Sequence, residues 1–298
     1  MTEIIKIQSV SQFNNERGQN TLHPLVSILD QSKSCQIKES RYLSELYIVF
    51  LKDSKCEELK YGRNNYDYED GSILFIAPGQ IFGFQSSGKL LQPSGWALCF
   101  HPELLRGTNL AKSIREYSFF SYDSNEALHV SEKEKITLIE CFNKILIEIT
   151  QPIDKHSRTL IVNNIELFLN LCTRFYDRQF ITREFANKDV LSKFEGLLDT
   201  YFYSGKLIDL GLPSVYYFAK ELNLSPKYFG DLIKKLTGNS AQDYIHLKLT
   251  NIAKEKVLDT SKSISEIAFE LGFKYPSHFT RLFKQKVGQS PVGYRNLN

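Results

Sequence analysis

Four polar residues near the carboxyl end of the chain recur at the spacing of one helix face. They are Ser277, Thr280, Arg281 and Lys284, at positions i, i+3, i+4 and i+7. Hydroxyl and guanidinium groups bond base edges, and cationic groups attract phosphates. A solvated helix face has a similar composition, so the row indicates nucleic-acid binding only if the surrounding elements present it to DNA.

The residues around this row predict two short helices joined by a turn. Ser263 and Glu266 have the spacing of a capping box, Gly272 suits a left-handed stop, and Pro276 suits the first turn of a new helix that ends before Gly288. Each helix has one apolar face, made of Ile264, Ile267, Ala268 and Leu271 in the first and Phe279, Leu282 and Phe283 in the second. The two helices therefore pack across the turn.

An internal repeat contains the same arrangement a second time. Residues 214–244 align on residues 263–294 with an offset of 49 that grows to 50 after the turn. Between the copies, residues 241–259 predict one continuous helix of about 28 Å, which is near the ~34 Å between successive major grooves on one side of B-DNA. A duplicated helix pair with a rigid spacer favours DNA binding over a generic helical bundle.

The carboxyl-terminal part resembles the paired helix-turn-helix domain of the AraC/XylS family of transcription regulators. The resemblance covers about residues 190–298, and the residues that support it are Ile267-Ala268, Leu271-Gly272-Phe273, His278-Phe279-x-Arg281-x-Phe283-Lys284 and Gly288-x-Ser290-Pro291-x-x-Tyr294-Arg295. It implies helix-turn-helix units at 214–238 and 263–288, each with a second helix that enters the major groove. The residues expected at the DNA are Lys227, Asp231, Lys234, Ser277, His278, Thr280, Arg281 and Lys284.

The first copy departs from the family pattern at its outward positions. Asp231 would be repelled by phosphates but can accept a hydrogen bond from cytosine N4, and Lys227 is the best donor. Gly230 suggests close backbone approach, although a merely tolerated glycine explains it equally well. Asn223 replaces the usual turn glycine and is compatible with the left-handed conformation. Lys248 stands in the linker helix, where we expect a structural role.

The first part of the chain predicts a sheet followed by helices. Residues 46–52, 72–77 and 95–100 are short apolar runs separated by turn residues, as in an antiparallel barrel or sandwich. Segments 66–84 and 95–105 resemble the cupin-like regulatory domain of the same family. The aromatic residues that could line an effector pocket there are Phe50, Phe82, Phe84 and Trp96, although core filling is the more common role of each one.

The expected fold class is therefore α+β, in two domains. Residues 1–185 form a cupin-like antiparallel β-barrel with flanking helices, and residues 186–298 form an all-α DNA-binding domain whose two units are joined by a linker helix. The polar stretch 177–189 is the expected boundary. Helices at 131–150 and 157–176 are candidates for a dimer interface, because the second is apolar on more than one side. A helix sandwiched inside its own domain explains that pattern at least as well.

Composition agrees with an ordinary globular protein that has a basic carboxyl-terminal part. Residues 190–298 contain 15 Lys or Arg and 10 Asp or Glu, a balance of +5, whereas the rest of the chain has −2. The five cysteines include no C-x-x-C pair, and no apolar run is long enough to span a bilayer. We expect a cytoplasmic protein that is not inserted in a membrane.

The functional hypothesis is a homodimeric, ligand-responsive activator that binds double-stranded promoter DNA and contacts RNA polymerase. An enzyme is the competing class, because cupin-like barrels often hold a metal. Residues 41–100 contain no histidine, and the six histidines of the chain have no ligand spacing, so we expect no metal, no cofactor and no catalytic residue. An interaction protein whose barrel binds no small molecule remains a third possibility.

Overall fold

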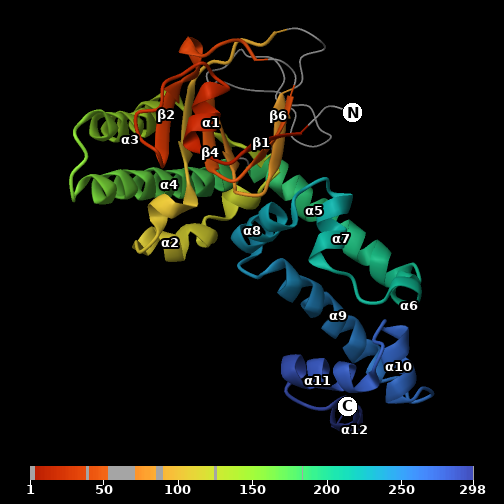
Figure 1. Cartoon of the computed structure of the whole chain (residues 1–298). Coiled ribbons are helices and arrows are strands. Elements are labelled where there is room, and N and C mark those ends of the chain that lie inside the picture. The colour runs from red at the N-terminus through yellow and green to blue at the C-terminus, as the bar shows by residue number, and fades with distance from the viewer. Residues whose placement is uncertain are drawn as a thin grey trace. The chain divides into compact units, whose positions relative to one another are not determined.

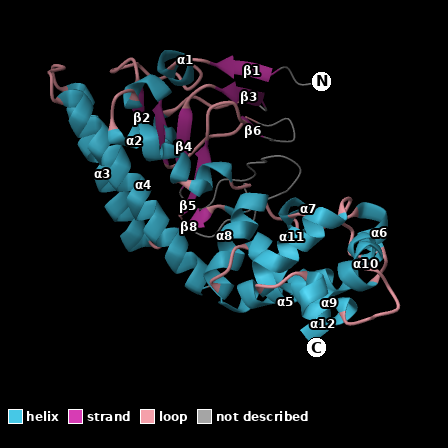
Figure 2. Cartoon of the chain, turned by 90° about the horizontal axis from the view of Figure 1, so that it is seen from below, coloured by secondary structure: helices cyan, strands magenta, loops and turns pink. Residues whose placement is uncertain are grey.

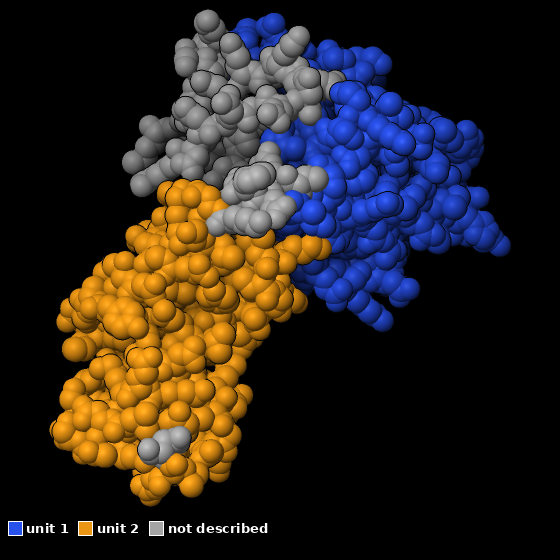
Figure 3. Space-filling model, turned by 180° about the vertical axis from the view of Figure 1, so that it is seen from behind, with its two compact units in different colours: residues 1–182 blue, residues 183–298 orange. Residues whose placement is uncertain are grey.

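The computed structural model describes residues 4–37, 40–52, 71–84, 90–123, 126–182 and 184–297, except the side chains of residues 84, 182 and 184–188. The chain divides into two compact units, Met1–Thr182 and Arg183–Asn298 (Figure 3). The strands lie in the first unit, and the described part of the second is helical (Figure 2). The mixed α+β class predicted from the sequence is confirmed at this level.

The first unit contains two sheets. The three-stranded sheet has the order β1-β3-β6 and the five-stranded sheet the order β2-β7-β4-β5-β8. The strands are β1 (Ile4–Ile7), β2 (Val26–Asp30), β3 (Ser40–Ser44), β4 (Tyr47–Lys52), β5 (Ser72–Ile76), β6 (Ile81–Phe84), β7 (Trp96–Phe100) and β8 (Leu128–His129). The runs predicted at 46–52, 72–77 and 95–100 are confirmed as β4, β5 and β7. Strand β1 is parallel to β3, so the expectation of a wholly antiparallel arrangement is wrong for this strand.

The central strands of the five-stranded sheet are buried on both faces. On one face Phe50, opposite Leu74 in the β4–β5 pair, packs in a core with Phe82 of the three-stranded sheet. On the other face the ring of Phe75 lies 4.2 Å from that of Phe119 and 6.3 Å from that of Tyr176. Coverage on both faces explains why β4 and β5 read as continuous apolar runs rather than as alternating ones.

The helices of the first unit are α1 (Val10–Asn15), α2 (Asn109–Ser113), α3 (Glu132–Thr150) and α4 (Ser157–Thr182). Helix α3 begins with a capping box in which Ser131 and Glu134 bond each other's backbone N–H groups. Helices α3 and α4 pack against each other along their length (Figure 1). Within the described residues, no helix is long and apolar enough to cross a membrane.

The second unit is built from α5 (Glu184–Tyr203), α6 (Lys206–Leu210), α7 (Val215–Glu221), α8 (Pro226–Thr237), α9 (Ala241–Val257), α10 (Ile264–Glu270), α11 (Pro276–Val287) and α12 (Pro291–Leu297). These helices share one apolar core that includes Phe194, Phe218, Phe229, Phe279 and Phe283. The division between the two units falls within the polar stretch 177–189. The chain is helical on both sides of this division, because α4 continues to Thr182 and α5 begins at Glu184.

Candidate nucleic-acid interface

The two helix pairs, α7–α8 and α10–α11, have turns with the same backbone hydrogen bonds. In the first, Leu224 N–H donates to Ala219 O at 2.9 Å around Asn223, which has φ 56°. In the second, Phe273 N–H donates to Ala268 O at 3.0 Å around Gly272, which has φ 79°. The left-handed conformation predicted for Asn223 is thus confirmed, and the two copies of the sequence repeat make equivalent turns.

The second helices of the two pairs, α8 and α11, have matching ends. Each is 12 residues long, begins with a proline, and is followed by a left-handed glycine, Gly238 or Gly288. The buried residues are Tyr228, Phe229, Leu232 and Ile233 in α8 and Phe279 and Phe283 in α11, and the predicted Leu282 is half-buried. The opposite face of each helix lies outward, where it is available to a partner.

The outward row of α11 lies as the sequence predicts. Ser277, His278, Arg281 and Lys284 are exposed and Thr280 is half-buried. Among the described residues, no ion pair involves Arg281 or Lys284. The ring of His278 lies 5.4 Å from that of Tyr275 in an edge-on contact, so this histidine is not part of the core. The row offers hydroxyl groups and two cations on one solvent-facing helix surface.

The corresponding row of α8 is less cationic. Lys227 Nζ lies 3.6 Å from Asp231 Oδ1, one helical turn away, so the two charges largely cancel. Lys234 is exposed. A side chain at Gly230 would meet no atom within 4 Å among the described residues, so nothing described here approaches its backbone closely. The space beside this backbone is open, so both interpretations of Gly230 remain.

Helix α9 positions the two pairs, and polar contacts fix it to both of its neighbours. Its Tyr244 donates a 2.5 Å hydrogen bond to Glu195 of α5, one turn before its Lys248 pairs with Asp199 of the same helix. Asp243 of α9 instead accepts from Lys286 of α11 at 2.9 Å. The structural role expected for Lys248 agrees with this geometry.

Further contacts fix the other end of α9. Arg295 of α12 donates to the carbonyl oxygens of Val257 and Asp259, at 2.6 and 3.1 Å, where the helix ends. Glu270 of α10 accepts from Lys256 of α9 at 2.9 Å. A cation at the carboxyl end of a helix bonds carbonyl groups that have no partner within the helix, and it interacts favourably with the helix dipole.

The ionisable groups around α9 are shifted by these bonds. Hydrogen bonds from Ser240 and Lys286 lower the pKa of the Asp243 carboxyl. The hydrogen bond to Glu195, together with burial, raises the pKa of Tyr244 to about 12. Tyr244 therefore remains a protonated donor at neutral pH.

The aromatic residues expected to line an effector pocket do not form one group in the structure. Phe50 and Phe82 are fully buried in the core between the two sheets, with ring centroids 6.0 Å apart. Trp96 is half-buried at the start of β7. The side chain of Phe84 lies outside the described residues. Phe50 and Phe82 thus fill the core, as the alternative interpretation holds.

Sequence reasoning missed one charged group in the same core. The Arg17 side chain is fully buried after α1, and its guanidinium lies 4.1 Å from the Phe13 ring centroid and 5.7 Å from that of Phe50. Burial lowers its pKa, and Tyr42 and Cys99 are among the groups that act on it electrostatically. The short polar run after the Phe13 position gives no signal that the arginine turns inward.

Metal-ligating residues do not gather in the described part of the chain, where no group of three or more His, Cys, Asp or Glu side chains is placed to hold an ion. The cysteines Cys35, Cys99, Cys141 and Cys172 are free thiols. Cys56 lies outside the described residues.

Comparison with known proteins places this geometry in a family. Residues 218–297 match the family described as "Helix-turn-helix domain". The transposon Tn10 TetD protein of Escherichia coli is 34% identical over 144 residues, a match that covers 48% of this chain and 91% of TetD. The chain belongs to the AraC/XylS family of transcription regulators.

Two further relatives of this AraC/XylS chain match over shorter stretches. The bifunctional transcriptional activator/DNA repair enzyme AdaA of Bacillus subtilis is 32% identical over 74 residues, which are 25% of this chain and 35% of AdaA. The melibiose operon regulatory protein of E. coli K12 is 31% identical over 80 residues, which are 27% of this chain and 26% of that protein. The chain thus spans about a third or less of the length of these two regulators.

Proposed function

We propose that this AraC/XylS chain regulates transcription by binding promoter DNA with α8 and α11 in successive segments of the major groove. The observation that supports the proposal best is the exposed row of α11, where Arg281 and Lys284 have no ion pair among the described residues. The equivalent turns of the two pairs support a second, matching contact through α8. These pairs act as the two helix-turn-helix units.

Each residue of the row has a role that follows from its chemistry. Arg281 donates two parallel bonds to a guanine edge or clamps a phosphate, and Ser277 and Thr280 bond base edges or backbone. Lys284 contacts phosphate. His278, exposed beside Tyr275, lies close enough along the helix to join the same contact.

Helix α8 has the weaker part in this proposal. Lys227 and Lys234 position the helix on phosphates, while Asp231 accepts from a cytosine N4 amino group. The Lys227–Asp231 pair lowers the net attraction of α8 for the phosphate backbone. Sequence discrimination therefore rests mainly on α11.

The linker helix supports simultaneous binding by both pairs. Seventeen residues of α9 span about 26 Å. Contacts at both of its ends restrict rotation of one pair against the other, so each recognition helix meets the DNA in a fixed register. Adjacent major-groove segments on one face of B-DNA are separated by about 34 Å. The recognition helices α8 and α11 lie beyond opposite ends of the linker, and we expect them to span this distance together.

The first unit is proposed to be a cupin-like regulatory domain that binds a small-molecule effector. Two facing sheets with an enclosed aromatic core are the support for this assignment. Arg17 between Phe13 and Phe50 gives that core a cation, which suits an effector with an anionic group. Because Arg17 is not exposed to solvent, an effector would reach it only if the core opened locally.

A homodimer is proposed to form through α3 and α4. Ile136 and Ile147 are exposed on one face of α3, and Leu160 and Leu167 are exposed on one face of α4. Exposed isoleucine and leucine side chains at this spacing favour association with a second copy. We further propose contact with RNA polymerase and activation as the outcome, since the relative AdaA is a transcriptional activator.

The test is fluorescence anisotropy of the full chain on the DNA upstream of its own gene and on a scrambled duplex, each at two salt concentrations. Phosphate contacts require affinity to fall as salt rises, and a specific regulator must prefer the native duplex. Equal binding to both duplexes would refute sequence-specific regulation through this DNA. No binding at either salt concentration would favour an interaction protein.

A further inference from the structure

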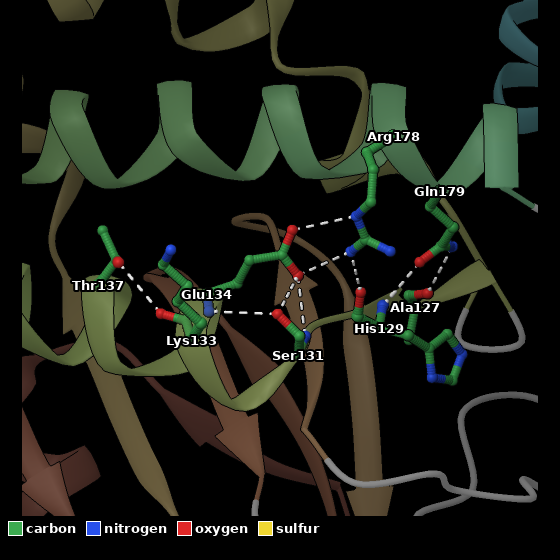
Figure 4. Close-up of polar contacts among 8 residues, drawn as sticks. All are labelled: Ala127, His129, Ser131, Lys133, Glu134, Thr137, Arg178 and Gln179. Carbon is green, nitrogen blue, oxygen red and sulfur yellow. Dashed lines mark hydrogen bonds and ion pairs between the residues drawn. The ribbon is translucent and has the colours of Figure 1, made fainter.

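Strand β8 forms one edge of the five-stranded sheet, and side chains of α4 occupy its outer side. On the inner side β8 pairs with β5, with Ser72 opposite His129. On the outer side His129 N–H donates to Gln179 Oε1 at 2.7 Å, and Gln179 Nε2 donates to Ala127 O at 3.2 Å (Figure 4). The glutamine amide therefore takes the place of a further strand at this edge.

Arg178, the residue before this glutamine, extends the contact. Its guanidinium donates to His129 O at 2.7 Å and to both carboxylate oxygens of Glu134, at 3.0 and 2.9 Å (Figure 4). Glu134 also accepts from the backbone N–H of Ser131 at 2.8 Å as part of the capping box of α3. We name this group of Ala127, His129, Glu134, Arg178 and Gln179 the α4–β8 contact.

Aromatic packing holds the same part of α4 against the same segment. Tyr176 donates to Glu126 O at 3.1 Å, and its ring stacks on that of Phe119 with centroids 5.5 Å apart. Gln179 is only 2% exposed. Three of the last seven residues of α4 are thus bonded to residues 126–129, so the end of this helix follows the backbone of β8.

The position of this contact in the chain gives it a consequence for regulation. Helix α4 ends at Thr182, three residues after Gln179, and α5 of the second unit begins at Glu184. A change in the pairing of β8 with β5 displaces the last turn of α4, because β8 is bonded on both of its edges. Helix α5 in turn bonds α9 through Glu195 and Asp199.

We propose that the α4–β8 contact is the regulatory connection by which the state of the sheet-containing unit changes DNA binding by the second unit. The inference rests on the proposed function, since it concerns control of that DNA binding. An effector that binds two states of the sheets unequally would shift the end of α4 between two positions. Arg178 and Gln179 act here as positioning residues that touch neither DNA nor effector.

Gln80 provides a matched control for Gln179. Its amide also joins two backbone segments of the first unit: Ala77 N–H donates to Gln80 Oε1 at 2.8 Å, and Gln80 Nε2 donates to Phe120 O at 2.9 Å. Neither backbone group belongs to α4 or β8. Gln179→Met and Gln80→Met therefore each remove two similar bonds, but only the first loosens the α4–β8 contact.

The experiment measures DNA affinity and hydrogen exchange of the full-length variants at a temperature where each is folded. We expect Gln179→Met to change the dissociation constant for the upstream duplex by about fivefold or more, the usual size of an allosteric coupling, and Gln80→Met to change it by less than about twofold. We also expect faster amide exchange in residues 184–203 for Gln179→Met alone. Arg178→Gln, at a side chain that is 39% exposed, gives the same result with less risk to folding.

The possible outcomes separate this inference from the proposed function. Equal changes for the Gln179 and Gln80 variants, or no change for Gln179→Met and Arg178→Gln, would overturn the inference while the wild type still binds its DNA. If the wild type shows no preference for the upstream duplex, the proposed function fails. Amide exchange in residues 184–203 of Gln179→Met is then the only test of the proposed regulatory connection. Exchange equal to that of the wild type would overturn the inference.

Discussion

Two cations of helix α11 are predicted to contribute unequally to DNA binding. Arg281 is exposed and makes no ion pair among the described residues, whereas Lys286, five residues later, bonds Asp243 at 2.9 Å. The perturbations are Arg281→Gln and Lys286→Gln, which each remove one positive charge from the same helix. In the proposed complex Arg281 contacts DNA, and the charge of Lys286 is already offset by its carboxylate partner.

The expected magnitudes follow from counterion release. Loss of one phosphate contact makes the slope of log affinity against log salt less steep by about 0.9. The factor by which a fourfold rise in salt weakens binding is then about 3.5 times smaller for the variant than for the wild type. If Arg281 bonds a guanine edge instead, its loss costs about 1–3 kcal/mol at constant salt, or about 5- to 150-fold in affinity. For Lys286→Gln we expect less than half of either effect.

The assay is fluorescence anisotropy at four or more salt concentrations, with unfolding midpoints measured in parallel to show that both variants are folded. A reduced slope or a fixed loss for Arg281→Gln, with little change for Lys286→Gln, agrees with the proposed geometry. Equal losses for the two variants, or a greater loss for Lys286→Gln, would refute the assignment of Arg281 as the main DNA contact of α11.

Three further predictions concern stability, acidity and assembly. Gly238→Ala should lower the free energy of unfolding by about 1–2 kcal/mol, because Gly238 has a left-handed backbone. Gly272→Ala should lower it more, since the new Cβ would lie 2.8 Å from Leu207 O. Urea unfolding measures both losses, and equal losses would contradict the crowding at Gly272. Hydrogen bonds from Lys262 and Lys256 lower the pKa of Glu270 in the folded state, so its stabilising contribution is present above the unfolded pKa of about 4.3 and is lost as the pH falls below that value. Glu270→Gln should therefore flatten the acid side of the pH–stability curve, and an unchanged curve would show that the two lysine contacts contribute nothing. Leu167→Asp on the exposed face of α4 should convert the proposed dimer to a monomer in light scattering, and an unchanged mass would exclude this face.

Local rules predicted much of the secondary structure. The strand runs, the capping box at Ser263, the start of α11 at Pro276 and the left-handed Asn223 all depend on short-range chemistry that is visible in the sequence. The division between the two units falls within the boundary expected at 177–189, but composition did not predict that α4 continues to Thr182. Arg178 and Gln179 are polar, yet they bond β8, and these bonds stabilise the helix in this stretch.

The candidate site shows a similar limit. The sequence predicted the outward row of α11, because the period of the buried Phe279 and Phe283 determines which positions face out. Pairing between distant residues, such as Lys286 with Asp243, depends on how α9 crosses α11 and has no sequence signal. The Lys227–Asp231 pair was visible as an i, i+4 spacing, which would have reduced the cationic character expected of α8.

Hydroxyl-radical footprinting of the full chain on its upstream DNA tests the central claim, that both helix pairs bind DNA together. We predict two protected segments on one face of the duplex for each chain, with centres about 10 base pairs apart, and selective loss of one segment in Arg281→Gln. A single short protected segment, or protection that is the same on scrambled DNA, would contradict the account.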